Sequence, residues 1–442
     1  RFRKSLSYLK NHAMKKIYAL VDCDAFFCNC ERLFRPDLRG KPVIVLSNND
    51  GCTVSRTIEA KALGIEMAAP YFKIQKFCEE NGVYAFSSNF SLYTNISSRI
   101  MKTLSTLSPI IEYYSVDEAF LDLTGIAEPY EYAKRIRQTI AKKIGMPVSV
   151  GVAHTKVLCK VACHFAKQRP ELAGVSILLD QEKQDHYLKN MSVQKLWGIG
   201  KQRAIKLRLM GIKTAKDFRD YKDIVRIQQT LTKVGRQIQD ELRGHICFPL
   251  SIEIEKKKEI MSSRTFGSSV FTKEILKESI ATHASEVAKE LRSQRSVCME
   301  VTVFIRSNPF KENSSQYHRS TKHCFLSPTS NTFKIINTAL QCLDRIFKPG
   351  IEYKKSGVRI SHFQDSAEAT LSLFEPADTV KEEDLMLVMD KVNLREGKES
   401  LKSLACGLNN ITWKMNQRLK SKRFTTRWHE LREISCDYVA SK

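Results

Sequence analysis

The stretch SVDEAFLD, Ser115–Asp122, places two adjacent carboxylates, Asp117 and Glu118, inside an otherwise apolar run. Apolar residues on both sides are typical of a buried strand or a tight β-turn. A buried carboxylate is costly unless it is paired or binds a cation. The stretch therefore predicts an ion pair or a cation site at this point of the fold.

A second stretch, YALVDCDAFF at Tyr18–Phe27, has the same character, because a strand-like apolar run ends in Asp22 and Asp24. If the two stretches met in one sheet, their carboxylates would form an oxygen-rich site of the kind that Mg²⁺ prefers. Each acidic pair alone is better explained as solvated or salt-bridged. Only the joint pattern predicts a metal site.

The chain has 442 residues, which is enough for several domains with ample core. Its 72 Lys and Arg residues outnumber 48 Asp and Glu residues, and the formal net charge is +24. This excess predicts a polyanionic partner, for which DNA, RNA and an acidic membrane surface are candidates. A merely soluble basic protein is the alternative, since charge alone does not identify an enzyme.

The sequence argues against a membrane-spanning or secreted protein. It contains no run of 18 apolar residues, and the basic segment Arg1–Lys16 lacks the apolar region and cleavage site of a secretory signal. Met14 is a candidate natural start, with residues 1–13 as an N-terminal extension. The 13 cysteines are scattered through apparent core segments, which favours free thiols in a reducing cytoplasm over a zinc site.

Hydrophobic periodicity predicts alternating strands and helices up to about residue 180. We expect strands at 17–27, 43–46 and 148–152, and helices at 28–36, 57–63, 87–107, 130–144 and 155–167. This alternation fits an α+β fold whose sheet is of the ferredoxin-like kind.

A different unit begins in the segment Leu196–Ile212, where LWGIGK is followed by a second glycine turn. The pattern resembles a helix-hairpin-helix, in which Gly198 and Gly200 would let backbone N–H groups approach a DNA phosphate. Lys201 and Arg203 would add positive charge. An ordinary helical hairpin is the alternative.

The highly charged segment 251–262 lacks an apolar period and is expected to be a linker. Beyond it, an amphipathic helix and an alternating strand predict an α/β domain over residues 263–366. Arg264 and Arg306 are candidate DNA phosphate contacts of this domain, although solvated surface charge explains them equally well.

The acidic motifs VDCDAFF and SVDEAF resemble the two palm motifs of the Y-family, or translesion, DNA polymerases. The UmuC type, from bacteria and plasmids, is the most similar, and the resemblance runs from about Met14 to the C-terminus. Further matching stretches are SNNDGC at 47–52, EAKALGI at 59–65 and FSSNF at 86–90. The resemblance implies an error-prone, DNA-directed DNA polymerase of SOS mutagenesis and DNA repair.

The resemblance also implies a multi-domain, right-hand polymerase of the α+β class. Its parts would be a ferredoxin-like palm at 14–30 and 87–180, small fingers at 31–86, a helix-hairpin-helix thumb at 181–250, a little finger at 263–366, a clamp-binding-like peptide at 367–379 and a C-terminal UmuC-type extension at 380–442.

In such an enzyme, two Mg²⁺ ions assist transfer of a nucleotide from a dNTP to the 3′-hydroxyl of a primer on template DNA. Asp22 and Asp117 would bridge both ions, and Glu118 would bind the ion nearer the primer. The Cys23 carbonyl would complete the site, whereas Asp24 would be a structural neighbour.

The resemblance assigns the triphosphate to backbone N–H groups after the first acidic strand and to side chains of the fingers and palm. The residues in question are Ala25, Phe26, Phe27, Ser55, Lys61 and Lys167. Phe27 also matches the steric gate, whose ring would clash with a ribonucleotide 2′-hydroxyl. Packing in the core is the alternative role for this ring.

Two C-terminal segments are expected to bind other macromolecules. The peptide ATLSLF resembles the sliding-clamp peptide of bacterial polymerases, in which Leu371, Leu373 and Phe374 would fill an apolar pocket. Thr370 stands where the family favours Gln, and a strand edge or linker is the alternative. The basic, aromatic-interleaved tract Lys420–Trp428 would hold single-stranded DNA or a protein. The resemblance implies a UmuD′-like dimer and RecA as partners.

Two other functions share parts of this pattern. A non-catalytic DNA-binding accessory protein would keep the polymerase fold, but the presence of Asp22, Asp117 and Glu118 favours an enzyme. A nucleotidyl cyclase shares a palm-like sheet and paired acids, but it would need neither the helix-hairpin-helix nor a basic C-terminal half.

Overall fold

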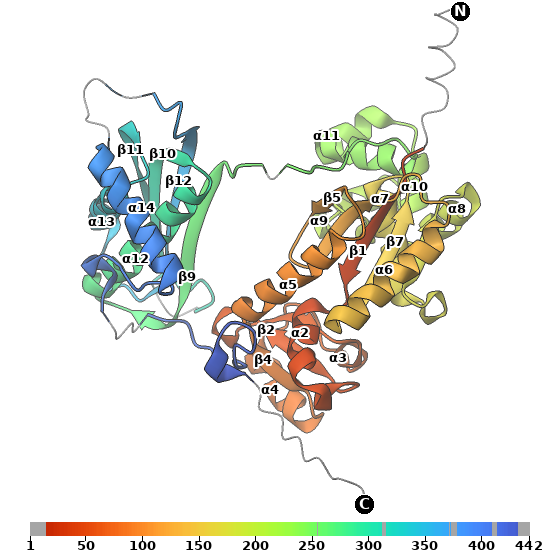
Figure 1. The fold of residues 1–442 in the computed structure, drawn as a ribbon, viewed down its shortest axis with the longest axis horizontal. Coiled ribbons are helices and arrows are strands. Elements are labelled where there is room, and N and C mark those ends of the chain that lie inside the picture. Colours follow the sequence, from red (N-terminus) through yellow and green to blue (C-terminus); the bar gives the residue numbers. More distant parts are fainter. Residues whose placement is uncertain are drawn as a thin grey trace, which may run out of the picture. The chain divides into compact units, whose positions relative to one another are not determined.

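The computed structural model describes residues 15–253, 255–311, 315–370, 372, 378–408 and 413–431. The chain divides into two compact units, which are described separately. Unit 1 comprises Arg1–Leu46, Cys52–Ile254 and Leu419–Lys442, and unit 2 comprises Ser47–Gly51 and Glu255–Arg418. Both units combine helices with sheets, and the predicted α+β class is confirmed (Figure 1).

Unit 1 is built on a five-stranded sheet whose central strand carries the first acidic motif. In their order across the sheet, the strands are β5 (Ile111–Tyr113), β6 (Glu118–Asp122), β1 (Tyr18–Cys23), β7 (Val148–Ala153) and β8 (Val175–Leu178). β1 is antiparallel to β6 and to β7, whereas β7 and β8 are parallel.

Helices cover both faces of this sheet, because alternate residues of β1 point into different cores. Leu20 packs in the core that contains α7 (Lys156–Gln168), whereas Val21 packs with α5 (Phe90–Leu104) and α6 (Pro129–Ile144). Even-numbered residues of β1, which include Asp22, therefore face α7.

α7 approaches the sheet closely at Gly151 of β7. A Cβ on this residue would lie 2.3 Å from the carbonyl oxygen of Cys159 and 2.4 Å from the nitrogen of Cys163. Only glycine therefore lets α7 lie so close to the sheet, and this approach sets the lysines of α7 beside the acidic end of β1.

The rest of unit 1 consists of a smaller sheet and a helical subdomain. The small sheet has the order β3 (Thr53–Arg56), β2 (Val43–Leu46) and β4 (Tyr84–Ser87), and it packs with α3 (Ile58–Ala62) and α4 (Tyr71–Glu80). α2 (Phe26–Phe34) connects β1 to this region. The helical subdomain contains α8 (Gln181–Lys189), α9 (Lys201–Leu209), α10 (Ala215–Asp220) and α11 (Ile224–Leu242).

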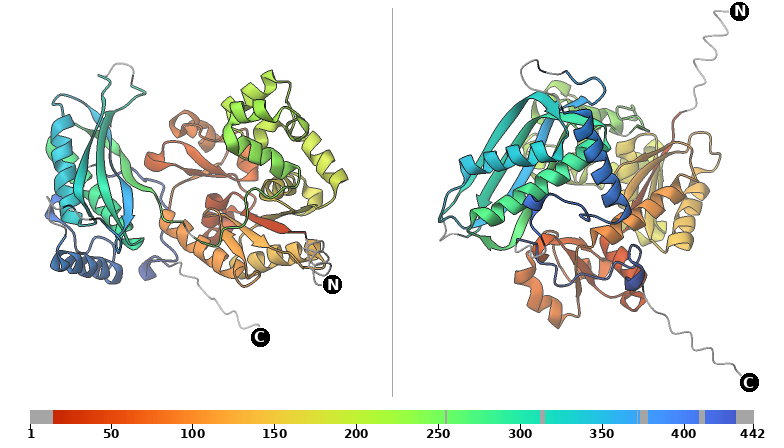
Figure 2. Two further views of the ribbon diagram at one scale, coloured as in Figure 1. Left: turned by 90° about the horizontal axis from the view of Figure 1, so that it is seen from above. Right: turned by 60° about the vertical axis from the view of Figure 1, so that its left-hand side comes forward.

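Unit 2 contains a four-stranded antiparallel sheet. Its order is β11 (His318–Thr329), β10 (Ser296–Ser307), β12 (Tyr353–Asp365) and β9 (Glu259–Val270). Two helices, α12 (Lys273–Ser293) and α13 (Thr332–Ile346), pack on one face of this sheet, and α14 (Val380–Arg395) follows (Figure 2). The predicted linker 251–262 is too long, because pairing of β9 with β12 already begins at Glu259.

Two boundaries near the acidic motif also differ from the prediction. The helix expected at 87–107 is α5, which starts at Phe90 because Tyr84–Ser87 pairs with β2. The strand expected to carry both acids starts at Glu118, and residues 115–117 form a bend before it. Val116 is 49% exposed, so the apolar run is buried only from Ala119 onward.

The cysteines that the structure describes are free thiols, most of them buried, in agreement with the prediction. Within the same described residues, we find no helix with both the length and the apolar character needed to cross a bilayer.

We expect Gly151→Ala to lower the free energy of unfolding by about 1–3 kcal/mol, because the new methyl group must displace the backbone of α7. Urea denaturation followed by circular dichroism measures this change. Gly200→Ala is the matched control, since a Cβ at Gly200 meets no atom within 4 Å. Equal stability of the two variants would contradict the close approach of α7.

Candidate active site

The pairing of β1 with β6 brings the two acidic motifs together. Asp22 lies directly opposite Glu118 in the antiparallel register. The backbone N–H of Cys23 donates a hydrogen bond of 2.9 Å to the carbonyl oxygen of Asp117. Directly opposed residues have Cβ atoms only about 5 Å apart. The three acids that the sequence singled out therefore converge at one end of β1.

Two lysines of α7 meet these acids. Lys160 Nζ lies 2.9 Å from Glu118 Oε2, and Lys167 Nζ forms an ion pair with Asp22 Oδ1. The two lysines are seven residues apart and so lie on one face of the helix. Sequence reasoning found Lys167 but missed Lys160, for which this spacing was the available indication.

The neighbouring acid Asp24 has structural partners. Its Oδ1 accepts a hydrogen bond of 2.9 Å from the Ser149 hydroxyl of β7, and Lys167 Nζ is 3.7 Å away. Asp117 Oδ1 accepts a 2.6 Å bond from the Ser115 hydroxyl, which fixes the bend before β6. Asp24 is thus held beside the three acids by the sheet itself.

Burial makes the negative charge at this site costly. It raises the pKa of Asp22 to about 7, against the opposing charge of Lys167. Burial also raises the pKa of Asp24. A cation bound between the carboxylates would favour their charged forms and reverse these shifts.

The side chains fit a divalent metal ion. The donors are carboxylate oxygens, which suit Mg²⁺, and two of the carboxylates already hold the ammonium groups of Lys160 and Lys167. In the part of the chain that the structure describes, no group of three His, Cys, Asp or Glu side chains is arranged ready for a metal. A metal ion would take the place of the ammonium groups.

The N-terminus of α2 begins directly after this site. Ala25 has the left-handed conformation φ 42°, ψ 51°, which turns the chain sharply from β1 into α2. The first N–H groups of a helix lack partners within it and attract anions. Phe27, in the first turn of α2, is half-buried and stacks on Tyr93 with ring centroids 4.7 Å apart at 19°.

Two residues near the small sheet, Lys61 and Ser55, were predicted to contact the nucleotide, and the structure gives them different surroundings. Lys61 of α3 is exposed, and its positive charge is the smallest of the named effects that oppose the rise in the pKa of Asp24 caused by burial. Ser55 of β3 is buried, and its hydroxyl acts on the thiol of Cys28. A nucleotide contact of Ser55 remains a prediction.

The glycines of the predicted helix-hairpin-helix precede α9. Gly198 has φ 80°, a conformation that favours glycine, and a Cβ there would lie 2.7 Å from Ile238 Cδ1. Gly200 is the N-cap of α9, and Lys201 is its first residue. Arg203 donates a hydrogen bond of 2.9 Å to the Gly198 carbonyl, which stabilises the loop.

The two arginines predicted to contact DNA in unit 2 lie on opposite faces of its sheet. Arg306 pairs with Lys355 on the face away from α12 and α13. Arg264 is opposite Ser356, whose hydroxyl bonds Ser279 of α12. The sequence pattern did not indicate that the two arginines lie on different faces of the sheet. Burial and the charge of Arg306 lower the pKa of Lys355, which marks a local concentration of positive charge on the first face.

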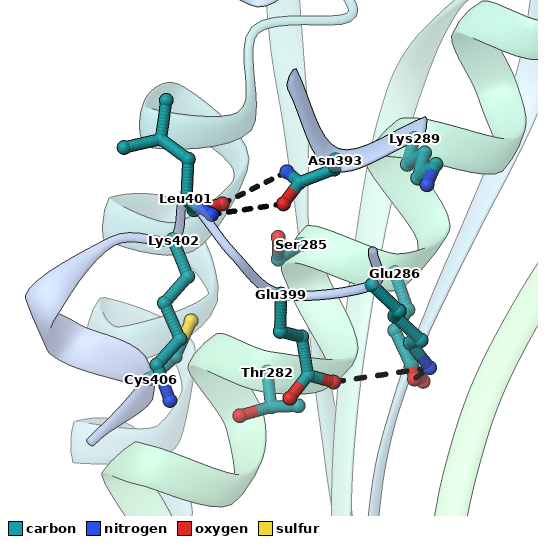
Figure 3. Close-up of a pocket in the computed structure, with 10 residues that line it drawn as sticks. Thr282, Ser285, Glu286, Lys289, Asn393, Glu399, Leu401, Lys402 and Cys406 are labelled. Carbon is teal, nitrogen blue, oxygen red and sulfur yellow. Dashed lines mark hydrogen bonds and ion pairs between the residues drawn. The ribbon is translucent and has the colours of Figure 1, made fainter. Parts of the chain in front are cut away.

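The predicted clamp-binding residues Leu371, Leu373 and Phe374 lie outside the described residues. The segment after α14 packs on α12 and lines a small cavity with Thr282, Ser285 and Glu286 of that helix (Figure 3). Lys398 Nζ is 2.7 Å from Glu286 Oε1. The cavity lined there is partly open to solvent.

Known protein families match most of the chain. The impB/mucB/samB family matches residues 21–164, and its C-terminal domain matches residues 257–373. A domain of unknown function matches residues 383–434. The first match includes the three converging acids and Lys160.

Protein UmuC of Salmonella typhimurium is 37% identical over 95% of this chain and 100% of its own length. The chain belongs to the UmuC family of Y-family DNA polymerases. MucB of Escherichia coli is 34% identical over 94% of this chain and 99% of its own. DNA polymerase IV of Listeria innocua is 31% identical over 61% of this chain and 75% of its own.

Solved structures agree on the fold. A Y-family DNA polymerase chimera built on Dbh superimposes with a TM-score of 0.61 at 22% identity, covering 78% of this chain and 98% of the other. The insertion ternary complex of Dbh DNA polymerase has the same identity and coverage with a TM-score of 0.52. The predicted family, fold and enzyme class are confirmed: UmuC-family proteins are translesion DNA polymerases, which act on DNA and dNTPs with a divalent metal cofactor.

We expect the wild-type protein to bind Mn²⁺, a paramagnetic probe for Mg²⁺, and Asp22→Asn to weaken this binding at least about tenfold, which is about 1.4 kcal/mol. The expectation follows from the loss of one of the carboxylates that converge with Glu118. Electron paramagnetic resonance of the free ion measures the affinity. Asp37→Asn, at an exposed ion pair with Arg35, is the control. Similar affinities of both variants would contradict a metal site at β1.

Proposed function

We propose that Asp22, Asp117 and Glu118 form the catalytic centre at which this polymerase extends a primer past damaged template bases. The observation that carries the proposal is the register of β1 against β6, which sets Asp22 opposite Glu118. When bound, two Mg²⁺ ions supply activation of the primer 3′-hydroxyl and neutralisation of the leaving pyrophosphate.

Each chain group has a separate task at this centre. Asp22 and Asp117 would hold both ions, Glu118 would hold the ion nearer the primer, and the Cys23 carbonyl would be the fourth protein ligand. Lys160 neutralises Glu118 while no ion is bound. Neutralisation by lysine limits the cost of two half-buried carboxylates side by side.

The nucleotide is held between α2, α3 and α7. N–H groups of Ala25, Phe26 and Phe27 lie at the N-terminus of α2, which favours the triphosphate. Lys61 and Lys167 supply charge from α3 and α7. Ser55 contributes a further hydroxyl.

Phe27 selects the sugar by acting as a steric gate. Its ring is half-buried and lies against Tyr93, so it has little room to withdraw from a 2′-hydroxyl. A ring that is only half-buried and is backed by Tyr93 supports a gate role for Phe27 over a role in the core alone.

DNA is bound through its phosphates, which gives affinity without sequence preference. In unit 1, the contacts are the N–H groups around Gly198 and Gly200 with the side chains of Lys201 and Arg203. In unit 2, Arg306 is the better-supported contact because Lys355 lies beside it. Arg264, on the face of the sheet that carries α12, is the second proposed contact.

Protein partners bind the C-terminal part of the chain. We assign a UmuD′-like dimer and RecA to the extension after residue 380. The sliding clamp is assigned to Leu371, Leu373 and Phe374. These assignments are supported by membership of the UmuC family.

We expect Asp117→Asn combined with Glu118→Gln to reduce primer extension about a thousandfold or more, since metal ions supply several kcal/mol and each 1.36 kcal/mol is tenfold in rate. DNA affinity should change little, because these side chains do not belong to the proposed phosphate contacts. Extension in Mg²⁺ and fluorescence anisotropy with labelled primer-template measure the two properties.

The control for this experiment is Asp37→Asn combined with Glu131→Gln, which removes two exposed carboxylates by the same substitutions. Retained synthesis in the Asp117, Glu118 double variant would refute the catalytic assignment.

We expect Phe27→Ala to lower the preference for dNTP over the matching ribonucleotide by about 10- to 100-fold, because a missing steric contact in a pocket has effects of this size. Single-nucleotide insertion with dCTP and CTP opposite guanine measures the ratio. Phe72→Ala, at a ring that is 77% exposed on α4, is the control. An unchanged ratio in Phe27→Ala would remove the gate role.

A further inference from the structure

The C-terminal segment 419–424 is built into the polymerase core of unit 1. Leu419 and Ser87 exchange hydrogen bonds: the Ser87 N–H donates to the Leu419 carbonyl at 3.1 Å, and the Leu419 N–H donates to Ser87 Oγ at 3.0 Å. Lys420 forms a parallel bridge with Ser87. The segment thus extends the end of β4, and Figure 1 draws it in dark blue beside β4 and α2. It lies within the domain of unknown function.

Asn89 joins this segment to α5. Its side-chain amide donates to Ser421 Oγ at 2.9 Å and to the carbonyls of Ser421 and Lys422 at 3.2 Å each. Asn89 is also the N-cap of α5, and its carbonyl accepts the Tyr93 N–H at 3.1 Å. Asn89 is fully buried. The segment therefore fixes the turn of α5 that carries Tyr93.

Tyr93 in turn supports Phe27 from behind. The two rings stack at 4.7 Å and 19°. The Tyr93 hydroxyl donates a hydrogen bond of 2.7 Å to Glu31 Oε1, and both residues are 1% exposed. A swing of the Tyr93 side chain about χ1 would break this buried bond, so the position of the ring is held.

The C-terminal segment also influences the pKa of Glu31. Burial raises the pKa of Glu31, and the hydroxyls of Tyr93 and Ser421 oppose the rise. Glu31 Oε2 is buried without a hydrogen-bond partner, so the Tyr93 hydroxyl makes the hydrogen bond that holds this carboxylate.

The segment contacts α2 at a second point. Phe27, Glu31 and Phe34 are spaced by four and three residues and so form one stripe along α2. Phe424 stacks on Phe34 with centroids 4.7 Å apart at 10°. The C-terminal segment therefore holds the far end of the same helix face whose first turn carries Phe27.

We propose that segment 419–424 is a positioning element for sugar selection, which acts through Asn89, Tyr93 and Glu31 to keep the Phe27 ring from yielding. The inference rests on the proposed gate role of Phe27. A steric gate discriminates only if its ring stays in place to within about 0.5 Å, and that requires packing and hydrogen bonds around the ring. Segment 419–424 supplies part of this support, with Ser421 and Tyr93 as its positioning residues.

The test uses the full-length protein with Ser421→Ala, Tyr93→Phe and, as reference, Phe27→Ala. The kcat/KM for inserting dCTP and CTP opposite guanine is measured for each. We expect Ser421→Ala and Tyr93→Phe each to lower the dCTP/CTP ratio at least about fivefold, the loss expected for one hydrogen bond. Ser421→Thr keeps the hydroxyl and should keep the ratio. Ser400→Ala, an exposed serine of the same domain, is the matched control.

The outcomes separate the two proposals. If Phe27→Ala lowers the ratio and the Ser421 and Tyr93 variants leave it unchanged, the gate stands and the positioning role is overturned. If Phe27→Ala leaves the ratio unchanged, both are overturned. A purely structural role would lower insertion of both nucleotides equally, which also overturns the inference. Thermal melting of each variant establishes that it is folded, and the ratio within one preparation does not depend on the folded fraction.

Discussion

The proposed catalytic centre depends on the antiparallel register of β1 and β6. Direct opposition of Asp22 and Glu118 places two carboxylates on the face of the sheet that α7 covers. A slip of one residue would turn Asp22 toward the core of α5 and α6, because side chains alternate along a strand. The register is fixed by the buried residues on either side, among which Leu20 and Val21 pack in different cores. The apolar core of unit 1 therefore determines where the acids meet.

Two carboxylates placed opposite each other repel and destabilise the fold unless positive charges lie beside them. The lysines of α7 provide these charges. Lys160 pairs with Glu118, and its ammonium group lies 4.4 Å from the centroid of the Tyr114 ring, where a cation is favoured. These contacts stabilise the acids in the absence of an ion, yet they compete with a metal for the same oxygens. The close approach at Gly151 sets this balance, because it fixes the distance from α7 to the sheet. The same lysine contacts that stabilise the fold therefore weaken metal binding, a trade-off that is common at active sites.

Local sequence patterns predicted most of the elements and the acids that converge, because periodicity and motif spacing are properties of neighbouring residues. They failed where a contact joins distant segments. The spacing of Lys160 from Lys167 puts both lysines on one face of a helix, but only the pairing of β1 with β6 shows that this face meets the acids. Arg264 and Arg306 look equivalent, although strand register places them on opposite faces of one sheet. The bonds between Asn89 and Ser421 join residues 332 positions apart, and no local pattern indicates them.

Segment 419–424 of the C-terminal domain packs against α2 and the start of α5 and so stabilises both helices. A buried carboxylate such as Glu31 is costly, and one hydrogen bond from Tyr93 offsets only part of that cost. The segment accepts the hydrogen bonds of the buried Asn89 amide, and its Phe424 ring stacks on Phe34. Without it, α2 and the start of α5 would expose an apolar ring and lose the partner of a buried Asn89. Segment 419–424 is therefore a structural part of the region of unit 1 that carries Phe27, and we expect its removal to disturb first the packing of the rings around Phe27.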